Sequence, residues 1–236
     1  MSKRAVILAG GMGTRLKPYT IVLPKPLMPI GEYPILEVVV RQLAFHQFDQ
    51  ITMAVNHQAE LIKAFFGDGS KWNVKIDYSM EDQQLGTMGP LKCIPDLPEN
   101  FLIMNGDVLT NLNYADFYNA HVQNQNLFTI SAYRREHQID YGVLKVDKNL
   151  RLSGFEEKPH ARYNVSMGIY MANRKILEFI PENAPFGFDH LMLGLLAAKN
   201  QVAVQFFDGY WLDIGRPDDY ALAIDSFEKL KGKFLP

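Results

Sequence analysis

The chain has 236 residues, 47% of them hydrophobic and 21% charged, which is enough for one domain to bury a full core. Its 24 basic and 26 acidic residues give a formal net charge of -2, so the chain lacks the positive charge with which proteins attract nucleic acid. The single cysteine, Cys93, allows no internal disulfide, and the apolar run at residues 5–9 is too short for a signal-peptide core or a membrane span. We therefore expect a cytoplasmic protein that binds neither nucleic acid nor membranes.

Predicted strands and helices alternate along the chain. Short apolar runs of strand length occur at residues 5–8, 51–55, 101–104, 128–132 and 202–206. Stretches with helical spacing occur at residues 35–45, 59–66, 114–122, 176–180 and 190–199. This alternation predicts a single α/β domain with a doubly wound, mainly parallel sheet. Such sheets bind ligands beyond the carboxyl ends of their strands, which points to the loops after Leu8 and Met104.

The pattern changes at about Tyr141. Shorter strand-like segments follow at residues 142–146 and 165–171, on either side of the charged loop Glu156-Glu157-Lys158-Pro159. No linker or repeat interrupts the chain. We therefore expect residues 1–140 and 141–236 to be two halves of one domain, the second forming a lid or an acceptor-binding half packed on the same core.

A glycine-rich segment, Gly10-Gly11-Met12-Gly13, follows the first predicted strand directly. Glycines let backbone amides approach a phosphate closely, although the pattern alone also fits an ordinary turn. It is not a dinucleotide fingerprint, because Leu16 stands where that motif needs glycine, and it lacks the Gly-Lys-Ser/Thr of a Walker loop. Arg15 ends the segment, and Lys25 follows between two prolines that stiffen the backbone around it.

Two aspartates end apolar segments that lie far apart in the sequence. Asp107 follows the predicted strand at 101–104, and Asp213 lies within Trp211-Leu212-Asp213-Ile214-Gly215, just before a helix led by Pro217. Magnesium prefers oxygen ligands and commonly takes one or two protein carboxylates together with substrate phosphates. Each aspartate could instead cap a loop or a helix.

Residues 10–20, followed by Pro24-Lys25-Pro26, resemble the signature of the sugar-phosphate nucleotidyltransferases, also called nucleotide-sugar pyrophosphorylases. The resemblance implies an enzyme with a Rossmann-like fold that joins a nucleoside triphosphate to a sugar 1-phosphate and releases pyrophosphate, with Mg2+ as its cofactor. The motifs resemble most closely those of mannose-1-phosphate or heptose-1-phosphate guanylyltransferases. Thymidylyl-, uridylyl- or cytidylyltransferases for another hexose 1-phosphate, and a non-catalytic regulatory homologue that binds nucleotide sugars, stay open. A homodimer is compatible with this family.

The resemblance also implies roles for individual residues. It implies that residues 1–140 bind the nucleotide and residues 141–236 the sugar phosphate. The nucleotide would be held by Leu8, Ala9, Gly10, Gly11, Gly13, Thr14, Arg15, Lys25, Gly86 and Thr87. The catalytic residues would be Arg15, Lys25, Asp107 and Asp213, of which the two aspartates would hold the metal. The sugar phosphate would be held by Gly142, Glu157, Lys158 and Ser166, the last standing where mannose-type enzymes often have asparagine.

Overall fold

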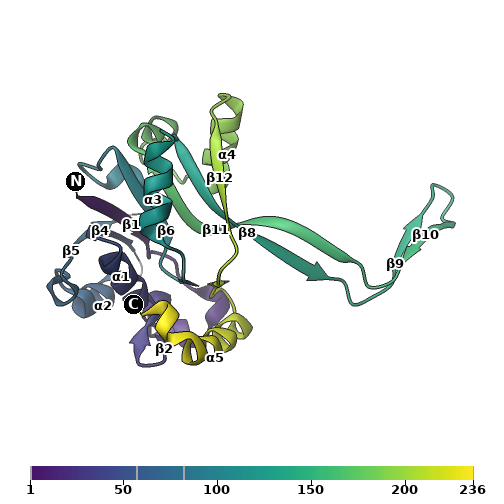
Figure 1. The fold of residues 1–236 in the computed structure, drawn as a ribbon, viewed down its shortest axis with the longest axis horizontal. Helices are drawn as coiled ribbons and strands as arrows, with labels where there is room; N and C mark the ends of the chain where they lie inside the picture. The colour runs from purple at the N-terminus through teal and green to yellow at the C-terminus, as the bar shows by residue number, and fades with distance from the viewer. Residues whose placement is uncertain (1, 57, 82, 236) are drawn as a thin grey trace.

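A seven-stranded sheet runs through the molecule (Figure 1). The computed structural model describes residues 2–56, 58–81 and 83–235. In spatial order the strands are β12 (Val202–Phe207), β8 (Phe128–Gln138), β11 (His160–Asn173), β6 (Asn100–Asn105), β1 (Lys3–Leu8), β4 (Phe48–Val55) and β5 (Lys75–Met80). Within this sheet β11 runs antiparallel to both of its neighbours, and the other six strands share one direction. The expected mainly parallel α/β sheet is confirmed.

The central strands are buried on both faces because their apolar side chains alternate between two cores. In β1, Ala5 and Ile7 join one hydrophobic cluster and Val6 joins the other. In β6, Leu102 and Met104 join the first cluster. Successive side chains of a strand point to opposite faces, so a continuous apolar run can serve two layers of helices at once.

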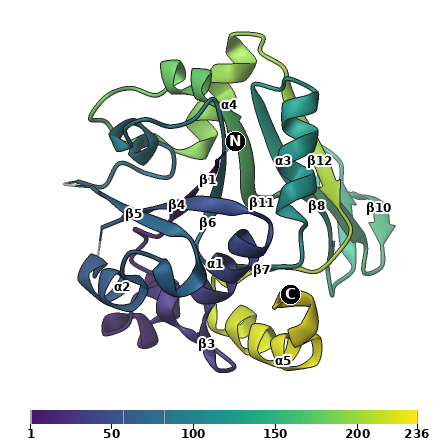
Figure 2. The ribbon, with the colours of Figure 1, turned by 60° about the vertical axis from the view of Figure 1, so that its left-hand side comes forward.

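Helices cover both faces of the sheet. One face packs against α1 (Ile35–Phe45), α2 (Ala59–Phe66) and α3 (Tyr114–Gln123), which Figure 2 shows on the same side of the sheet. The other face packs against α4 (Phe188–Ala197) and two 3-10 segments, Gly89–Cys93 and Arg174–Phe179. None of the described helices has the length and apolar character needed to cross a membrane.

A third cluster joins the end of the chain to its beginning. The helix α5 (Pro217–Phe234) packs its Phe227 against the short ribbon of β2 (Pro29–Ile30) and β3 (Tyr33–Pro34). A second ribbon pairs β7 (Val108–Thr110) with β13 (Trp211–Asp213), antiparallel. This ribbon places Asp213 opposite Val108, one residue from Asp107.

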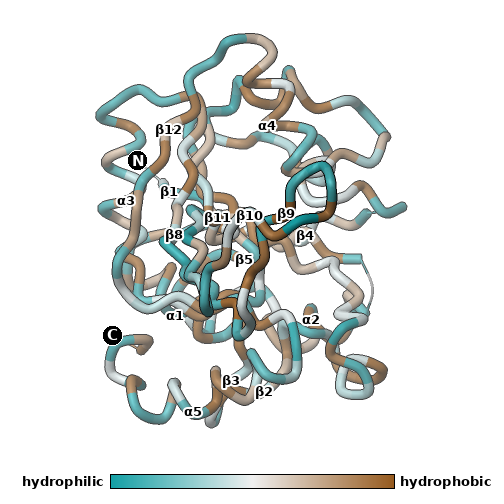
Figure 3. The backbone as a smooth tube through the Cα atoms, turned by 90° about the vertical axis from the view of Figure 1, so that its right-hand side faces the viewer, coloured by the Kyte–Doolittle hydropathy of each residue, from teal (hydrophilic) through white to brown (hydrophobic). Residues whose placement is uncertain are grey.

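Beyond the sheet, β8 and β11 continue together as an arm, residues 134–164. The arm ends in a hairpin of β9 (Val143–Val146) and β10 (Leu152–Glu156), far from the rest of the molecule in Figure 1. Figure 3 views the molecule from the arm's side, with the hairpin in front of the body. Between residues 134 and 164 every side chain is exposed or half-buried and none is buried.

The arm differs from the expectation that the chain after Tyr141 packs on the core. The two strands satisfy each other's backbone hydrogen bonds, so this ladder needs no helix layer beneath it. The remainder of the second half does join the core, through residues such as Ile169, Leu191 and Phe227.

Most predicted elements occur where the sequence placed them. The five predicted strands lie inside β1, β4, β6, β8 and β12, and three predicted helices correspond to α1, α2 and α3. The helix predicted at 190–199 begins and ends two residues earlier, as α4. The one predicted at 176–180 is instead a 3-10 segment, Arg174–Phe179, and β5 was not predicted.

Candidate active site

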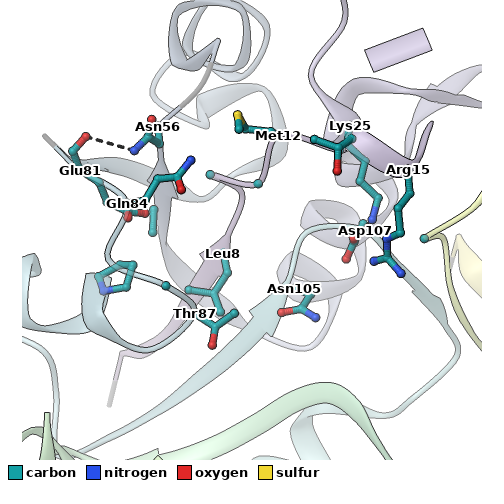
Figure 4. A pocket seen from close by; sticks show the side chains of 18 residues that line it. Leu8, Met12, Arg15, Lys25, Asn56, Glu81, Gln84, Thr87, Asn105 and Asp107 are labelled. Carbon is teal, nitrogen blue, oxygen red and sulfur yellow. Dashed lines mark hydrogen bonds and ion pairs between the residues drawn. The ribbon is translucent and has the colours of Figure 1, made fainter. Parts of the chain in front are cut away.

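A cavity of about 490 Å3 opens at the carboxyl ends of β1, β4 and β6, the edge that the sequence predicted (Figure 4). Its volume suits a small-molecule ligand. It is lined by Leu8, Gly10, Gly11, Met12, Gly13, Thr14, Arg15, Lys25, Ala54, Asn56, Glu81, Gln84, Gly86, Thr87, Pro90, Asn105, Asp107 and Gly215. Ten of the predicted site residues are among them.

The glycine-rich loop forms one wall of this cavity. Gly13 has φ 60°, and its carbonyl oxygen accepts hydrogen bonds from the Thr20 hydroxyl at 2.7 Å and the Leu16 amide at 2.9 Å. A Cβ at Gly13 would lie 2.8 Å from Cγ2 of Thr20, so the bend requires glycine. A Cβ at Gly11 would meet nothing within 4 Å, so this part of the loop has room beside it for a ligand.

Two cations converge on the same end of the cavity. Lys25 lies in the 3-10 turn Lys25–Leu27 between the buried Pro24 and Pro26, and its ammonium forms an ion pair with Oδ2 of Asp107. Arg15 lies against Gly215, where a Cβ would come within 3.4 Å of the guanidinium. Figure 4 shows Arg15, Lys25 and Asp107 together at this end.

The two aspartates lie beside these cations. Asp107 Oδ1 is buried and has no hydrogen-bond partner among the described residues. Desolvation raises the pKa of Asp213, the negative charge of Asp107 raises it further, and Lys25 and Arg15 lower it. The amide of Ile214 donates to the Asp107 carbonyl at 3.1 Å and so ties the two segments together.

A divalent cation fits this pair of carboxylates. The buried, unpartnered oxygen of Asp107 is a ligand without a partner, and a nearby positive charge would relieve its repulsion with Asp213. Among the described residues no group of three or more histidine, cysteine, aspartate or glutamate side chains could hold a metal. Magnesium sites commonly combine one or two protein carboxylates with substrate phosphates and water.

The opposite end of the cavity carries an acceptor-rich group, Asn56, Glu81 and Gln84 (Figure 4). Burial raises the pKa of Glu81, although the Leu85 amide donates to its Oε2 at 3.1 Å and lowers it. Its Oε1 lies over the glycine-rich loop, 3.1 Å from where a Cβ of Gly10 would be. The Glu81 carboxylate therefore borders both the cavity and the glycine-rich loop at this end.

Gly86 and Thr87 lie on the wall between the two ends. Gly86 has φ 76°, and a Cβ there would lie 2.8 Å from the carbonyl oxygen of Phe186. The Thr87 hydroxyl oxygen accepts a hydrogen bond from the Phe188 amide at 2.8 Å. Ala9 does not line the cavity; it is buried behind the loop, where its amide donates to the Ala54 carbonyl at 2.9 Å.

Several lining residues were not predicted, among them Asn56, Glu81, Gln84, Asn105 and Gly215. Asn56 and Asn105 lie at the ends of two strands that were predicted, so their positions could have identified them as candidates for the ligand edge of the sheet. Glu81 follows β5, whose strand was itself not predicted. Asn105 depends on Gly168, which has φ 72°, because a Cβ there would lie 2.6 Å from the Asn105 amide nitrogen.

Four predicted sugar-phosphate residues lie outside this cavity. Gly142, Glu157 and Lys158 belong to the arm, where Glu157 and Phe155 approach Gly142 closely. The Ser166 hydroxyl donates to the Tyr170 hydroxyl oxygen at 3.0 Å and lines a separate, largely apolar cavity of about 450 Å3. A single chain thus gathers most of the predicted nucleotide residues and Asp107 around one cavity, with Asp213 beside Asp107, but none of the predicted acceptor residues.

Known proteins are similar to this chain in sequence and in fold. The model of the nucleotidyl transferase family matches residues 4–229. The chain is 33% identical to a mannose-1-phosphate guanyltransferase of Yarrowia lipolytica over 92% of its own length, and 32% identical to a UTP--glucose-1-phosphate uridylyltransferase of Synechocystis over 94%. Each match covers 62% of the relative, so the chain spans about three fifths of the curated relatives' length.

Two solved structures are similar to this chain in fold. The crystal structure of HddC from Yersinia pseudotuberculosis has a TM-score of 0.74 and 28% identity, covering 95% of this chain and 99% of HddC. A second structure of HddC, complexed with GMP-PN, has a TM-score of 0.71. The expected family is confirmed: the chain belongs to the nucleotidyl transferase family.

Proposed function

We propose that the chain is a sugar-1-phosphate nucleotidyltransferase, which transfers a nucleoside monophosphate from a nucleoside triphosphate to a sugar 1-phosphate. The observation that carries this proposal is the convergence of the glycine-rich loop, Arg15, Lys25 and Asp107 at one end of a single cavity, with Asp213 close enough for the charges of the last three residues to shift its pKa. The relatives named above are a guanyltransferase and a uridylyltransferase for sugar 1-phosphates, which supports the same reaction class.

The reaction is a displacement at the α-phosphorus. An ionised oxygen of the sugar 1-phosphate forms a new bond to that phosphorus, and the bond to the β-phosphate oxygen breaks and releases pyrophosphate. The products are a nucleotide sugar and pyrophosphate, and no proton needs to leave the attacking phosphate at neutral pH. Two unit charges 4 Å apart repel by about 4 kcal/mol at an effective dielectric constant near 20, so bringing two polyanions together is the main obstacle.

The protein lowers this barrier by positioning and by charge. Arg15 and Lys25 are the cations that would neutralise the departing pyrophosphate, and backbone amides of the glycine-rich loop would hold its oxygens. The ion pair with Asp107 holds the ammonium of Lys25 beside another residue that lines the cavity. Catalysis would then rest on electrostatic stabilisation of fixed reactants, with no protein nucleophile.

Asp107 and Asp213 are the residues that would hold Mg2+. Oxygen ligands suit this ion, and the unpartnered Oδ1 of Asp107 supports the assignment. When bound, the ion would add positive charge beside the α-phosphate. Asp107 and Asp213 are in this way positioning residues for the metal and not proton donors.

We propose GTP as the donor. Guanine presents two adjacent N–H donors on its base-pairing edge, and a carboxylate accepts such a pair in a bidentate manner. Glu81 supplies a carboxylate at the far end of the cavity from the phosphate-binding group. HddC, which was solved with the guanosine nucleotide GMP-PN, and the mannose-1-phosphate guanyltransferases support this choice.

The acceptor that we propose is mannose 1-phosphate or a heptose 1-phosphate, by similarity to the guanyltransferases. Gly142, Glu157, Lys158 and Ser166 stay the residues proposed for it. We also propose that the protein acts as a homodimer in the cytoplasm, where its single cysteine stays reduced and nucleoside triphosphates are at hand.

The test is a panel of GTP, ATP, UTP, dTTP and CTP against mannose, heptose and glucose 1-phosphates, with pyrophosphate release as the readout. We expect GTP to give the highest kcat/KM. Glu81→Gln should lower the GTP to ATP ratio by about tenfold, since it replaces one charged acceptor by a neutral amide. Glu182→Gln, at an exposed position outside the cavity, is the matched control and should leave the ratio unchanged.

Two outcomes would change the assignment. A preference for a pyrimidine triphosphate would replace the guanylyltransferase proposal by a thymidylyl-, uridylyl- or cytidylyltransferase. Binding of nucleotide sugars without pyrophosphate release from any pair would identify a regulatory homologue instead of an enzyme.

A further inference from the structure

The cavity is complete for a nucleotide but incomplete for an acceptor. Its lining residues come from residues 8–25, 54–107 and Gly215, and none belongs to the arm. Glu157 and Lys158, the charged pair proposed for the sugar phosphate, lie on the arm with both side chains exposed. Within one chain, the arm contributes no residue to the cavity. If Glu157 and Lys158 bind the sugar phosphate, they must therefore reach a cavity in some other way.

A continuous ladder of backbone pairs between β8 and β11 stiffens the arm. Seven consecutive pairs join β8 to β11 along it, from His160 with Gln138 to Ser166 with Ala132. The Ile139 amide then donates to the Pro159 carbonyl at 3.0 Å. Folding the arm back onto its own cavity would bend or break this ladder, and each lost backbone hydrogen bond would cost about 1 kcal/mol. The ladder therefore favours contact of the arm with a cavity other than that of its own chain.

One face of the terminal hairpin is apolar and unpartnered in the single chain. Leu144 pairs with Phe155 and Val146 pairs with Leu152, and cross-strand partners point to the same side of a hairpin. The exposed fractions of these four side chains are 60%, 59%, 53% and 65%, respectively. An isolated two-stranded hairpin is at best marginally stable in water, so this face needs a surface to cover it.

We propose that two copies of this chain exchange their arms, so that the hairpin of each docks on the other and brings Glu157 and Lys158 to the other's cavity. This inference rests on the proposed function. A second copy is the occupant because the arm's charged pair is useful only beside a phosphate-binding cavity of this kind, which every copy carries. A two-fold exchange satisfies both arms and both cavities at once and leaves neither hairpin uncovered.

The geometry at the root of the hairpin supports delivery of a sugar. A Cβ at Gly142 would lie 2.6 Å from the Phe155 ring and 3.1 Å from a carboxylate oxygen of Glu157. Glycine therefore lets the backbone, an aromatic ring and a carboxylate meet at one point. Carboxylates accept hydrogen bonds from paired hydroxyls, and Lys158, next along the chain, attracts phosphate. The exchanged arm would thus carry the acceptor subsite, with the nucleotide subsite supplied by the other copy.

Purified heterodimers with two affinity tags test the exchange directly. The first joins an Asp107→Asn chain to a Lys158→Ala chain; the second joins wild type to a chain that carries both substitutions. Exchange predicts about half of wild-type activity per dimer from the first, because the intact arm serves the intact cavity, and almost none from the second. Arms that act on their own cavities predict the reverse, and that result would overturn the proposal.

A second variant tests the assembly without activity. Because Gln138 pairs with His160, deletion of residues 139–159 and insertion of Asn-Gly would close the arm with a two-residue hairpin turn. We expect wild type to have twice the 26.9 kDa chain mass by light scattering, and the shortened variant to be a monomer that still binds GTP by calorimetry. A monomeric wild type, or a shortened variant that stays dimeric, would overturn the exchange.

These readouts separate the two proposals. A wild-type enzyme that forms arm-dependent dimers but releases no pyrophosphate from any substrate pair would refute the proposed function and leave the assembly standing. An active wild type with the reversed heterodimer pattern would refute the exchange alone.

Discussion

At the end of the cavity that we propose for phosphate, the positive charges of Arg15 and Lys25 are matched by the negative charges of Asp107 and Asp213. The Lys25 and Asp107 side chains are 11% and 19% exposed, so their charges act at close range with little screening. A nucleoside triphosphate brings about four further negative charges, which this balanced group cannot neutralise alone. If these residues bind a triphosphate as proposed, a divalent cation would supply the positive charge that they lack.

Removing either carboxylate should therefore impair turnover. Asp107→Asn and Asp213→Asn should each lower kcat by at least about 10²-fold, because the amide keeps the shape of the side chain but loses the charge that we propose holds Mg2+. The measurement is pyrophosphate release against Mg2+ concentration, with metal binding followed by calorimetry. Asp49→Asn, at the opposite end of β4, is the control and should behave as wild type. Near-normal turnover in both cavity variants would remove the metal assignment.

His121 is a buried residue far from this chemistry, and it should make stability depend on pH. Its Nδ1 lies 2.8 Å from the Thr129 hydroxyl oxygen, and its Nε2 is buried without a described partner. Burial lowers its pKa from 6.5 to about 4. Between these values the unfolded chain binds more protons than the folded one, so the free energy of unfolding falls as pH falls from 6.5 towards 4.

The expected loss from this group is about 3 kcal/mol over that window, at 1.36 kcal/mol for each pKa unit. Urea unfolding at pH 7.0, 5.5 and 4.5 measures it. His121→Asn keeps a side chain that can hydrogen-bond Thr129 but does not titrate, so its stability should fall less steeply. Parallel curves for the two proteins would show that His121 does not contribute.

At the scale of elements, the sequence predicted the strands that are apolar runs and missed the strand whose apolar pattern is interrupted by charged residues. The strands of β1, β4 and β6 are continuous apolar runs, which are recognisable without a structure. In β5 at the sheet's edge, Lys75 and Asp77 interrupt the apolar pattern. The strand-like segment at residues 142–146 is found as β9, but the extension of the arm away from the core was not predicted, because strands without a core beneath them have no regular alternation of buried and exposed residues.

The candidate site divides in the same way. The glycine-rich loop, Lys25 and Asp107 were predicted because each follows or closes a recognisable strand or loop motif. Glu81 was missed together with the strand that precedes it. The predicted residues Glu157 and Lys158 fall on the arm, and their distance from the cavity depends on how the arm is placed, which no local pattern encodes.

The loop after β1 holds its shape through one glycine. Gly13→Ala should lower the free energy of unfolding by about 1–2 kcal/mol, because alanine is strained at positive φ and its Cβ would press on Thr20. Gly11→Ala, where a Cβ meets nothing within 4 Å, is the matched control for stability. The thermal midpoint should fall by roughly 2–4 °C for each kcal/mol in the first variant and stay unchanged in the second. Equal midpoints would contradict the strain argument.

The whole molecule consists of a well-packed body and an arm without a core. The body places its three hydrophobic clusters on the two faces of the sheet and beneath α5, and the cavity lies at the edge where β1, β4 and β6 end. The arm leaves this body through β8 and β11, the second and third strands from one edge of the sheet. A chain of this shape exposes apolar side chains that a second copy can cover.

Stability should then depend on protein concentration. If folded dimers unfold to separate chains, each hundredfold rise in concentration adds about 2.7 kcal/mol to the free energy of unfolding per dimer, which corresponds to a rise in thermal midpoint of roughly 2–4 °C. Scanning calorimetry of wild type at concentrations spanning two orders of magnitude measures the shift. The variant that lacks residues 139–159 is the control: its body keeps all three clusters, so it should unfold cooperatively at a midpoint independent of concentration. A wild-type midpoint that does not move would mean that the chains unfold singly, and the exchanged arms would then contribute nothing to the stability of the molecule.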